Sequence, residues 1–163
     1  MQKKAINYAH LFPDSILMKF ITESNAIEGE VTLPERTPLD AIKKFLNSDI
    51  TEQSILELHN AISEGRDILR GCYRKCQVRV GNYYPPPAIE VGNRMRDYFR
   101  KLEYFNSYRA HNEFELIHPF EDMNGRMGRY IWLNIALREG YCFQLGFLHK
   151  YYYQTLDKLE KDL

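Results

Sequence analysis

The sequence predicts an all-α fold that carries one small β-hairpin. Amphipathic stretches flanked by helix-capping residues recur along the chain, whereas only residues 75–80 alternate polar and apolar residues as a strand does. The chain of 163 residues has the size of one ordinary domain. It contains no repeat, low-complexity tract or linker. We therefore expect a single domain over residues 1–163.

Three helices are expected in the N-terminal third, each after a capping residue: 15–27 after Asp14, about 38–46 after Thr37, and about 52–63 after Asp49. Asp and Thr side chains accept hydrogen bonds from the first backbone N–H groups of a helix. Pro38 suits the first turn of the second helix, and Asp49 with Glu52 resembles a capping box. Gly29 is expected to end the first helix in a left-handed conformation.

The middle of the chain predicts the hairpin, near residues 75–84. Polar and apolar residues alternate over 75–80, and the turn-forming pair Gly81-Asn82 follows. Three prolines, Pro85–Pro87, forbid a helix and end any central strand. Because an isolated hairpin contributes little stability, we expect a flap at the surface and not a part of the core.

Helices return in the C-terminal half, at about 89–104, 108–117, 124–139 and 147–161. The second of these should stop at His118, because the next residue is proline. Gly140 is a suitable cap for the third.

Composition excludes several classes of protein. Lys+Arg and Asp+Glu number 22 each, so the zero net charge argues against a nucleic-acid binder that works by bulk electrostatics. The three cysteines form neither a zinc knuckle nor a redox CxxC, and reduced thiols are expected. The N-terminus lacks the apolar stretch of a signal peptide, and no window reaches about 18 apolar residues. We therefore expect a cytoplasmic protein without a membrane partner.

The segment HPFEDMNGRMGR, residues 118–129, carries the strongest chemical signal. A helix that starts after this loop presents N–H groups and a positive dipole end to an anion. Arg126 and Arg129 are three apart, hence on one helical face, which suits more than one phosphate group. Asp122 could hold Mg²⁺, and His118 could act as a general base. By residue types alone, a helix boundary with surface salt bridges stays open as the alternative.

The same segment resembles the signature of the Fic (filamentation induced by cAMP) family, HPFx(D/E)GNGRxxR. It matches at every fixed position except the glycine, which is Met123 here. RGCYR (70–74) is similar to the family's entry to the flap, and VRVGNYYPPP (78–87) is similar to the flap itself. The resemblance covers most of residues 55–145 and implies a Fic-type helical bundle. By this division the core is about 50–145, after an N-terminal segment 1–36 and before a C-terminal helix 147–163.

The resemblance implies transfer of a nucleotide monophosphate, usually AMP from ATP with Mg²⁺, to a hydroxyl of a target protein. His118 would deprotonate that hydroxyl, and Asp122 would hold the magnesium ion. The backbone of Asn124-Gly125 and the side chain of Arg126 would bind the α- and β-phosphates. Arg129 would orient the γ-phosphate. The target is unknown and includes the chain itself as a candidate.

Three further expectations concern the rim of this site. The flap residues are expected to dock the target as an added strand: Val78, Arg79, Val80, Gly81 and Asn82. Asn134, on the inner face of the motif helix, is a candidate contact to the nucleoside. Met123 is expected at negative φ, where its side chain only reshapes the rim of the phosphate loop.

Residues 21–30, ITESNAIEGE, place Ser24 and Glu28 four apart on one helical face. A plain interpretation is the polar edge of a capped helix. The segment also resembles the inhibitory pattern of the Fic family, (S/T)xxxE(G/N), upstream of the core. The resemblance implies that Glu28 pairs with Arg129 and blocks productive placement of ATP, with Ser24 anchoring the helix.

Several alternatives stay open. A Fic relative could transfer UMP or another phosphate-containing group, or remove AMP with the same glutamate. From another class, Met123 favours a non-catalytic nucleotide-binding or interaction module, because a non-glycine at positive φ is strained. A homo-oligomer is possible, and a nucleic-acid partner finds little support. His59, His111 and His149 have no metal-ligand spacing with one another and are expected to be structural or at the surface.

Overall fold

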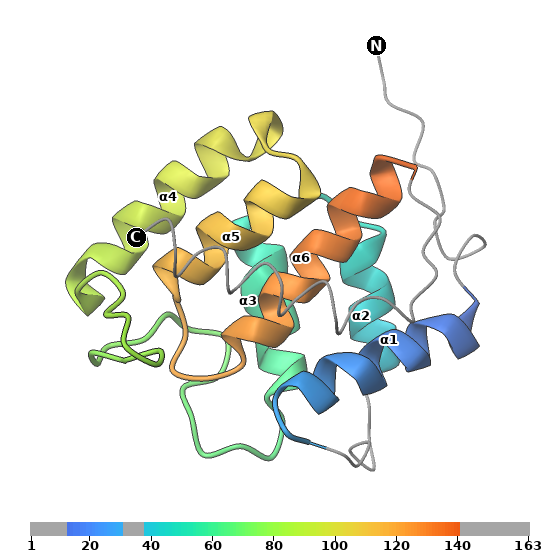
Figure 1. The fold of residues 1–163 in the computed structure, drawn as a ribbon, viewed down its shortest axis with the longest axis horizontal. Helices are drawn as coiled ribbons and strands as arrows, with labels where there is room; N and C mark the ends of the chain where they lie inside the picture. The colour runs from blue at the N-terminus through green and yellow to red at the C-terminus, as the bar shows by residue number, and fades with distance from the viewer. Residues whose placement is uncertain (1–12, 31–37, 141–163) are drawn as a thin grey trace.

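The computed structural model describes residues 13–30 and 38–140. Within these ranges it forms six α-helices and two short 3-10 helices, shown in Figure 1. The α-helices are α1 (Asp14–Ile27), α2 (Leu39–Leu46), α3 (Glu52–Ile62), α4 (Val91–Lys101), α5 (Ser107–Ile117) and α6 (Asn124–Arg138). The 3-10 helices η2 (Ala88–Glu90) and η3 (Leu102–Tyr104) flank α4. The helix expected at 147–161 lies outside the described residues.

Helices α5 and α6 run side by side at the centre of the bundle (Figure 1). Helix α4 covers the outer side of α5, whereas α2 and α3 pack on α6. Helix α1 contacts α6 and lies across its first turns (Figure 1). The loop that joins α5 to α6, residues 118–123, therefore faces the C-terminal end of α1.

The apolar face of α1 explains its position. Leu17, Phe20 and Ile21 are almost fully buried, at a spacing that puts them on one side of the helix. The ring of Phe20 lies 5.9 Å from that of Tyr130 on α6. Burying an aliphatic or aromatic side chain contributes roughly 1.5–3 kcal/mol. Helix α1 is therefore held on the bundle by core packing, independently of its polar contacts.

Two of the expected N-caps are wrong. Helix α1 has Pro13 at its N-cap, and Asp14 is its first helical residue, with its carboxylate 2.6 Å from Lys43 Nζ. Helix α3 is capped by Thr51, whose hydroxyl accepts a hydrogen bond from the N–H of Ser54 at 3.1 Å. Asp49 is instead 2.9 Å from Arg138 Nη1. In both places the aspartate finds a cation on another helix, so the cap falls to a neighbouring residue. Thr37 lies outside the described residues.

The glycine caps are confirmed. Gly29, after the end of α1, has φ 78°, and Gly140, after α6, has φ 79°. Helix α5 ends before His118, as the following proline predicts.

The expected strand over 75–80 is wrong, because no strand forms within the described residues. Around Gly81 only one antiparallel bridge closes, between Val80 and Tyr83, with N–H···O distances of 2.9 and 2.8 Å. Beyond it the prolines lack N–H groups, so no ladder can continue. Side chains join the two arms of this flap (residues 75–87) instead. Gln77 donates to the carbonyl of Pro85 at 2.9 Å, and Arg74 donates to that of Pro86 at 2.6 Å.

None of the helices within residues 13–30 and 38–140 is both long and apolar enough to span a membrane.

Candidate active site

Two left-handed residues bracket the loop between α5 and α6. His118 has φ 49° and Met123 has φ 69°, and they are the only non-glycine residues with positive φ in the described part of the chain. Such a conformation costs a residue with a side chain about 1–2 kcal/mol. Strain of this kind persists where the surroundings hold it, and it clusters at functional sites.

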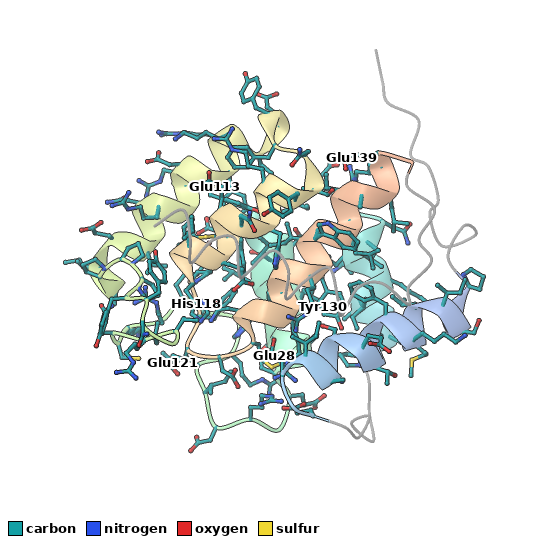
Figure 2. The ribbon with its side chains drawn as sticks, in the orientation of Figure 1. Glu28, Glu113, His118, Glu121, Tyr130 and Glu139 are labelled. Carbon is teal, nitrogen blue, oxygen red and sulfur yellow. The ribbon has the colours of Figure 1, made fainter. Side chains whose placement is uncertain are left out.

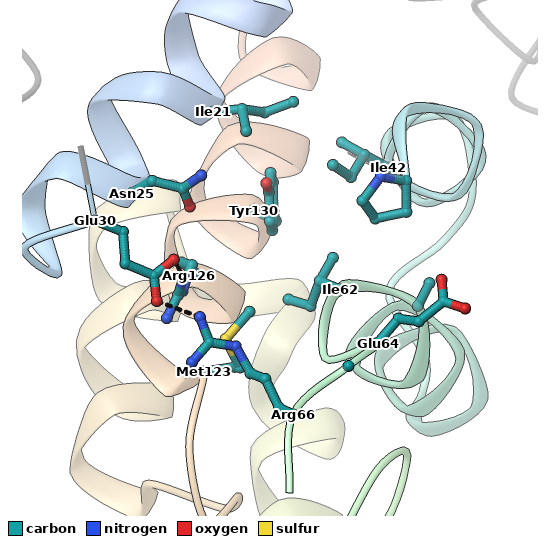
Figure 3. A pocket seen from close by; sticks show the side chains of 13 residues that line it. Ile21, Asn25, Glu30, Ile42, Ile62, Glu64, Arg66, Met123, Arg126 and Tyr130 are labelled. Carbon is teal, nitrogen blue, oxygen red and sulfur yellow. Dashed lines mark hydrogen bonds and ion pairs between the residues drawn. The ribbon is translucent and has the colours of Figure 1, made fainter. Parts of the chain in front are cut away.

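The expectation of negative φ at Met123 is wrong. Its carbonyl already accepts the first α6 hydrogen bond, from Met127 N–H at 2.9 Å, while its own N–H donates to Asp122 Oδ1 at 2.6 Å. The chain must therefore turn sharply at this residue. The side chain is 5% exposed and lines a pocket of about 320 Å³ with Arg126 and Tyr130 (Figure 3). Burial of the thioether offsets part of the backbone strain.

Asn124 holds the loop closed with its side chain. Its Oδ1 accepts the N–H of Phe120 and its Nδ2 donates to the carbonyl of Phe120, each at 2.9 Å. Phe120 is fully buried and stacks on His59, with ring centroids 3.7 Å apart. The amide side chain of Asn124 is therefore structural, which leaves its backbone for the anion contact expected of it.

The start of α6 has the properties of an anion site. The first N–H groups of an α-helix have no partner within the helix, and the dipole is positive there. No side chain caps this helix. A Cβ on Gly125 would collide with the Glu28 carboxylate and crowd Arg129. The glycine therefore permits an acidic group to approach the first turn of α6.

Arg129 is held by the end of α1, as the sequence predicts. It is 2% exposed, and its Nε donates to Ser24 Oγ at 2.7 Å. Its Nη2 donates to the carbonyl of Ser24 at 2.9 Å and to Glu28 Oε1 at 2.6 Å. Figure 2 shows Glu28 at the same end of the molecule as His118. The Glu28 carboxylate, just after α1, thus pairs with one of the two motif arginines, which are Arg126 and Arg129 of the segment 118–129.

The second motif arginine is also occupied, by a residue that no sequence pattern selects. Arg126 Nη1 lies 2.7 Å from Glu30 Oε2. The other oxygen of Glu30 pairs with Arg66 (Figure 3). Arg66 in turn lies 3.0 Å from Asp122 Oδ2. Glu30 follows the end of α1, so helical spacing does not point to it. In the sequence, Glu30 is 96 residues away from Arg126 and 36 residues away from Arg66.

His118 is suited to act as a base at neutral pH. Its side chain is 16% exposed, and burial lowers its pKa from 6.5 to about 4, aided by the nearby positive charge of Arg74. The imidazole is therefore neutral at pH 7 and able to accept a proton. Its Nδ1 lies 3.7 Å from Glu115 Oε2. Burial raises the pKa of Glu115 to about 7.

His59 and His111 are buried, which confirms one of the two expectations for them. Burial lowers the pKa of each to about 4. His59 Nδ1 accepts the N–H of Gly71 at 3.0 Å, and His111 packs against Gly128 of α6. With the largely buried His118 they make up the three histidines of the protein's described part.

Arg74 ties the flap to the loop between α5 and α6, and sequence reasoning missed this role. The residue is 2% exposed, and its Nε donates to the carbonyl of His118 at 2.8 Å. Its Nη1 donates to the carbonyl of Cys76 at 3.0 Å, and its own N–H donates to that of Pro119 at 2.9 Å. In the sequence Arg74 is only one arginine of the segment RGCYR, and no periodic pattern there indicates its hydrogen-bond partners. The tip of the flap, residues 79–82, is exposed.

The side chain of Asn134 bonds to the C-terminal end of α2, and its expected contact with a nucleoside stays a prediction. The residue is fully buried. Its Nδ2 donates to the carbonyls of Phe45 at 2.7 Å and of Ser48 at 3.1 Å. Both amide hydrogens are thus used to close the C-terminal end of α2.

Asp122 is suited to bind a magnesium ion whose remaining ligands come from the substrate phosphates and water. No group of three or more His, Cys, Asp and Glu side chains comes together in the part of the chain that the structure describes. Mg²⁺ in nucleotide sites uses one or two carboxylates together with phosphate oxygens and water. The Asp122 side chain is 45% exposed and lies just before the start of α6. One accessible carboxylate beside an anion site meets that requirement.

These features define an all-α protein with an anion site at a helix start, beside a neutral histidine. Comparison with known proteins agrees with this description. The Fic/DOC family model matches residues 49–136, and the chain belongs to the Fic/DOC family.

Several relatives that match over most of this chain are named protein adenylyltransferase Fic. Protein adenylyltransferase Fic of Aedes aegypti is 31% identical over 156 residues, covering 82% of this chain and 29% of the relative. That of Drosophila melanogaster is 32% identical over 139 residues, covering 76% of this chain and 26% of the relative. The chain thus spans less than a third of the length of these relatives.

Solved structures share the fold. A Fic family protein from Desulfovibrio desulfuricans G20 matches with a TM-score of 0.63 at 24% identity, over 83% of this chain and 53% of the other. Fic-1 from C. elegans matches with a TM-score of 0.63 at 20% identity, over 86% of this chain and 53% of the other.

Proposed function

We propose that this chain is an autoinhibited protein adenylyltransferase, which transfers AMP from ATP to a hydroxyl side chain of a target protein. The observation that carries the proposal is the contact of Glu28 with Arg129, at 2.6 Å, at the start of α6 and at the same end of the molecule as His118. Membership of the Fic/DOC family and relatives named protein adenylyltransferase support it.

In this proposal His118, whose imidazole is neutral at pH 7, accepts the proton of the target hydroxyl. The hydroxyl oxygen then bonds to the α-phosphorus, and the bond from that phosphorus to the bridging oxygen breaks. Pyrophosphate leaves with the electron pair. The backbone N–H groups of Asn124 and Gly125 and the guanidinium of Arg126 stabilise the negative charge on the phosphates. Positioning is the main contribution of the protein to such a transfer.

Asp122 would hold the magnesium ion that accompanies ATP, and when bound the ion would neutralise phosphate charge. The flap would supply the edge on which a target segment docks, because residues 79–82 are exposed and Arg74 fixes the base of the flap to His118. Docking through main-chain groups tolerates targets of varied sequence.

Autoinhibition follows from the charge balance at Arg129. The guanidinium that would orient the γ-phosphate already holds Glu28 and Ser24. ATP can then bind only with its γ-phosphate displaced, which moves the α-phosphate out of line with the hydroxyl. A displacement of about 1 Å can lower a rate by about 100-fold.

A second candidate is a non-catalytic nucleotide-binding module, which the φ of 69° at Met123 favours. The other nucleotidyl donors, such as UTP, differ from ATP only in the base. These alternatives separate by experiment.

The test is intact-mass spectrometry of the protein after incubation with Mg²⁺ and each nucleoside triphosphate. We expect Glu28→Gly to gain the mass of AMP from ATP, the wild type to gain little, and Glu28→Gly with His118→Ala to gain none. Asp14→Asn is the matched control, because it removes a carboxylate of α1 that, within residues 13–30 and 38–140, pairs only with Lys43. ATP binding without any transfer by Glu28→Gly would favour the binding module. Equal modification of wild type and Glu28→Gly would contradict autoinhibition.

A further inference from the structure

Beyond Glu28, four charged residues form a continuous row at the site: Arg126, Glu30, Arg66 and Asp122. Figure 3 shows the first three of them. The signs alternate along the row. At one end stands a motif arginine, and at the other stands the carboxylate that fits magnesium. Glu30 and Arg66 lie between them and belong to neither the family signature nor the inhibitory pattern.

The row is partly buried, so its charged groups are only partly solvated. The Arg126 side chain is 6% exposed, and those of Arg66 and Glu30 are 30% and 34% exposed. Burial alone would raise the pKa of Glu30, but hydrogen bonds from Arg126 and Arg66 lower it below its ordinary value. Glu30 is therefore a carboxylate at neutral pH, with one guanidinium on each of its oxygens.

The backbone delivers Glu30 to this place. Helix α1 ends at Ile27, and Gly29 turns the chain with φ 78°. The N–H of Glu30 then donates to the carbonyl of Asn25 at 3.0 Å. This turn folds Glu30 back beside Glu28, and both carboxylates face α6. The two acids reach different arginines, Glu28 reaching Arg129 and Glu30 reaching Arg126.

The row has the charge pattern that a metal-bound diphosphate would bring. Under the proposed function Arg126 meets the α- and β-phosphates and Asp122 meets the metal ion. In the structure the Glu30 carboxylate meets Arg126, and the Arg66 guanidinium lies between that carboxylate and Asp122. The Glu30 carboxylate thus occupies Arg126, where a phosphate would bind, and the Arg66 guanidinium occupies Asp122, where the metal ion would bind.

We propose that Glu30 is a second inhibitory carboxylate, which mimics a phosphate group at Arg126, while Arg66 replaces the metal ion at Asp122. This inference rests on the proposed function, since it assumes that nucleotide phosphates bind at the start of α6. The Glu30 and Glu28 contacts differ in the part of the nucleotide whose binding each would oppose. Glu28 opposes the γ-phosphate alone, whereas Glu30 and Arg66 oppose the inner phosphates and the metal ion.

That difference can be measured by binding, without turnover. The full-length chain is titrated calorimetrically with adenosine, ADP and ATP in the presence of Mg²⁺. Glu30→Gln keeps the shape of the side chain and removes its charge. Glu64→Gln is the matched control, because Glu64 lines the same pocket and forms no ion pair among the described residues (Figure 3). Thermal melting verifies that each variant is folded.

We expect Glu30→Gln to bind ADP about tenfold more tightly than the wild type, a usual size for coupling between competing contacts. Glu28→Gln should tighten ATP more than ADP, because ADP has no γ-phosphate. Adenosine should bind all variants equally, and Glu64→Gln should resemble the wild type. Arg66→Gln should lower the Mg²⁺ concentration needed for half-maximal ADP binding, because it uncovers Asp122.

Equal ADP affinity of wild type and Glu30→Gln would overturn the inference and leave the proposed function intact. So would an equal gain from Glu30→Gln and Glu64→Gln, because the effect would then be one of general charge. An unchanged magnesium requirement in Arg66→Gln would overturn the part assigned to Arg66. If neither ADP nor ATP bound to any variant, Glu28→Gln included, the proposed function would fall together with the inference.

Discussion

Met123 offers a sharp test, because the backbone there has φ 69° and ψ 8°. The perturbation is a pair of variants, Met123→Ala and Met123→Gly. Both lose the buried thioether, so the cost of the emptied space is nearly the same in each. The pair differs in the Cβ atom, which is what makes positive φ unfavourable.

The expected difference follows from two opposing effects. Removing Cβ relieves about 1–2 kcal/mol of strain at a left-handed residue. Glycine also loses more backbone freedom on folding, which ordinarily makes it about 0.5–1 kcal/mol worse than alanine. The net expectation is that Met123→Gly is more stable than Met123→Ala by about 0.5–1 kcal/mol. At an ordinary position the order would be reversed.

The assay is urea denaturation, with the free energy of unfolding compared at equal slope. The control is Gly92→Ala on α4, where φ is not positive and a Cβ meets nothing within 4 Å. There alanine should be the more stable residue. If alanine were also the more stable residue at position 123, the assigned backbone strain would be refuted. In the Glu28→Gly background we further expect Met123→Gly to transfer AMP faster than Met123→Ala.

Two further predictions concern the surroundings of the loop. Arg74→Lys should lower the free energy of unfolding by about 3 kcal/mol in urea titrations, because a lysine cannot hold the carbonyls of both flap and loop. The control Arg100→Lys, at an exposed position, should change the free energy of unfolding by less than about 0.5 kcal/mol. Equal effects of the two substitutions would contradict the role assigned to Arg74. Acid should destabilise the protein, because three largely buried histidines take up protons near pH 6.5 when unfolded but only near pH 4 when folded. Their contribution is lost as pH falls from 6.5 to 4, and Glu115, with its pKa raised to about 7, offsets part of the loss. We expect a net loss of about 2 kcal/mol between pH 7.5 and 5.5, and constant or rising stability over that range would contradict the burial of these groups.

The helices were predictable because their signals are local. An apolar residue every three or four positions buries one face, and glycine or proline marks the end, so α5 and α6 have nearly the expected bounds. Caps were less predictable, since Asp14 and Asp49 met cations on other helices. The flap strand failed for a related reason. Alternation in the sequence indicates a strand, but a ladder needs a partner with N–H groups, and Pro85–Pro87 have none.

The site followed the same division. His118, Asp122, Asn124, Arg126 and Arg129 lie within one short segment, which is why a phosphate site could be proposed from the amino-acid sequence alone. The hydrogen bonds of Asn134 were not predictable, because the carbonyls that accept them belong to α2 and the residues just after it. Arg74 was missed because the carbonyls that it holds are scattered over the flap and the loop.

By itself the sequence determined the family of this protein and the pattern of its helices, because both depend on neighbours in the chain. Tertiary structure decided how the charges are paired. Glu28 and Arg129 are 101 residues apart, and Glu30 and Arg126 are 96 apart. Their contact exists only because Leu17, Phe20 and Ile21 bury α1 against the bundle and bring its acidic end to α6. Core packing, not the charges, therefore sets which carboxylate meets which arginine.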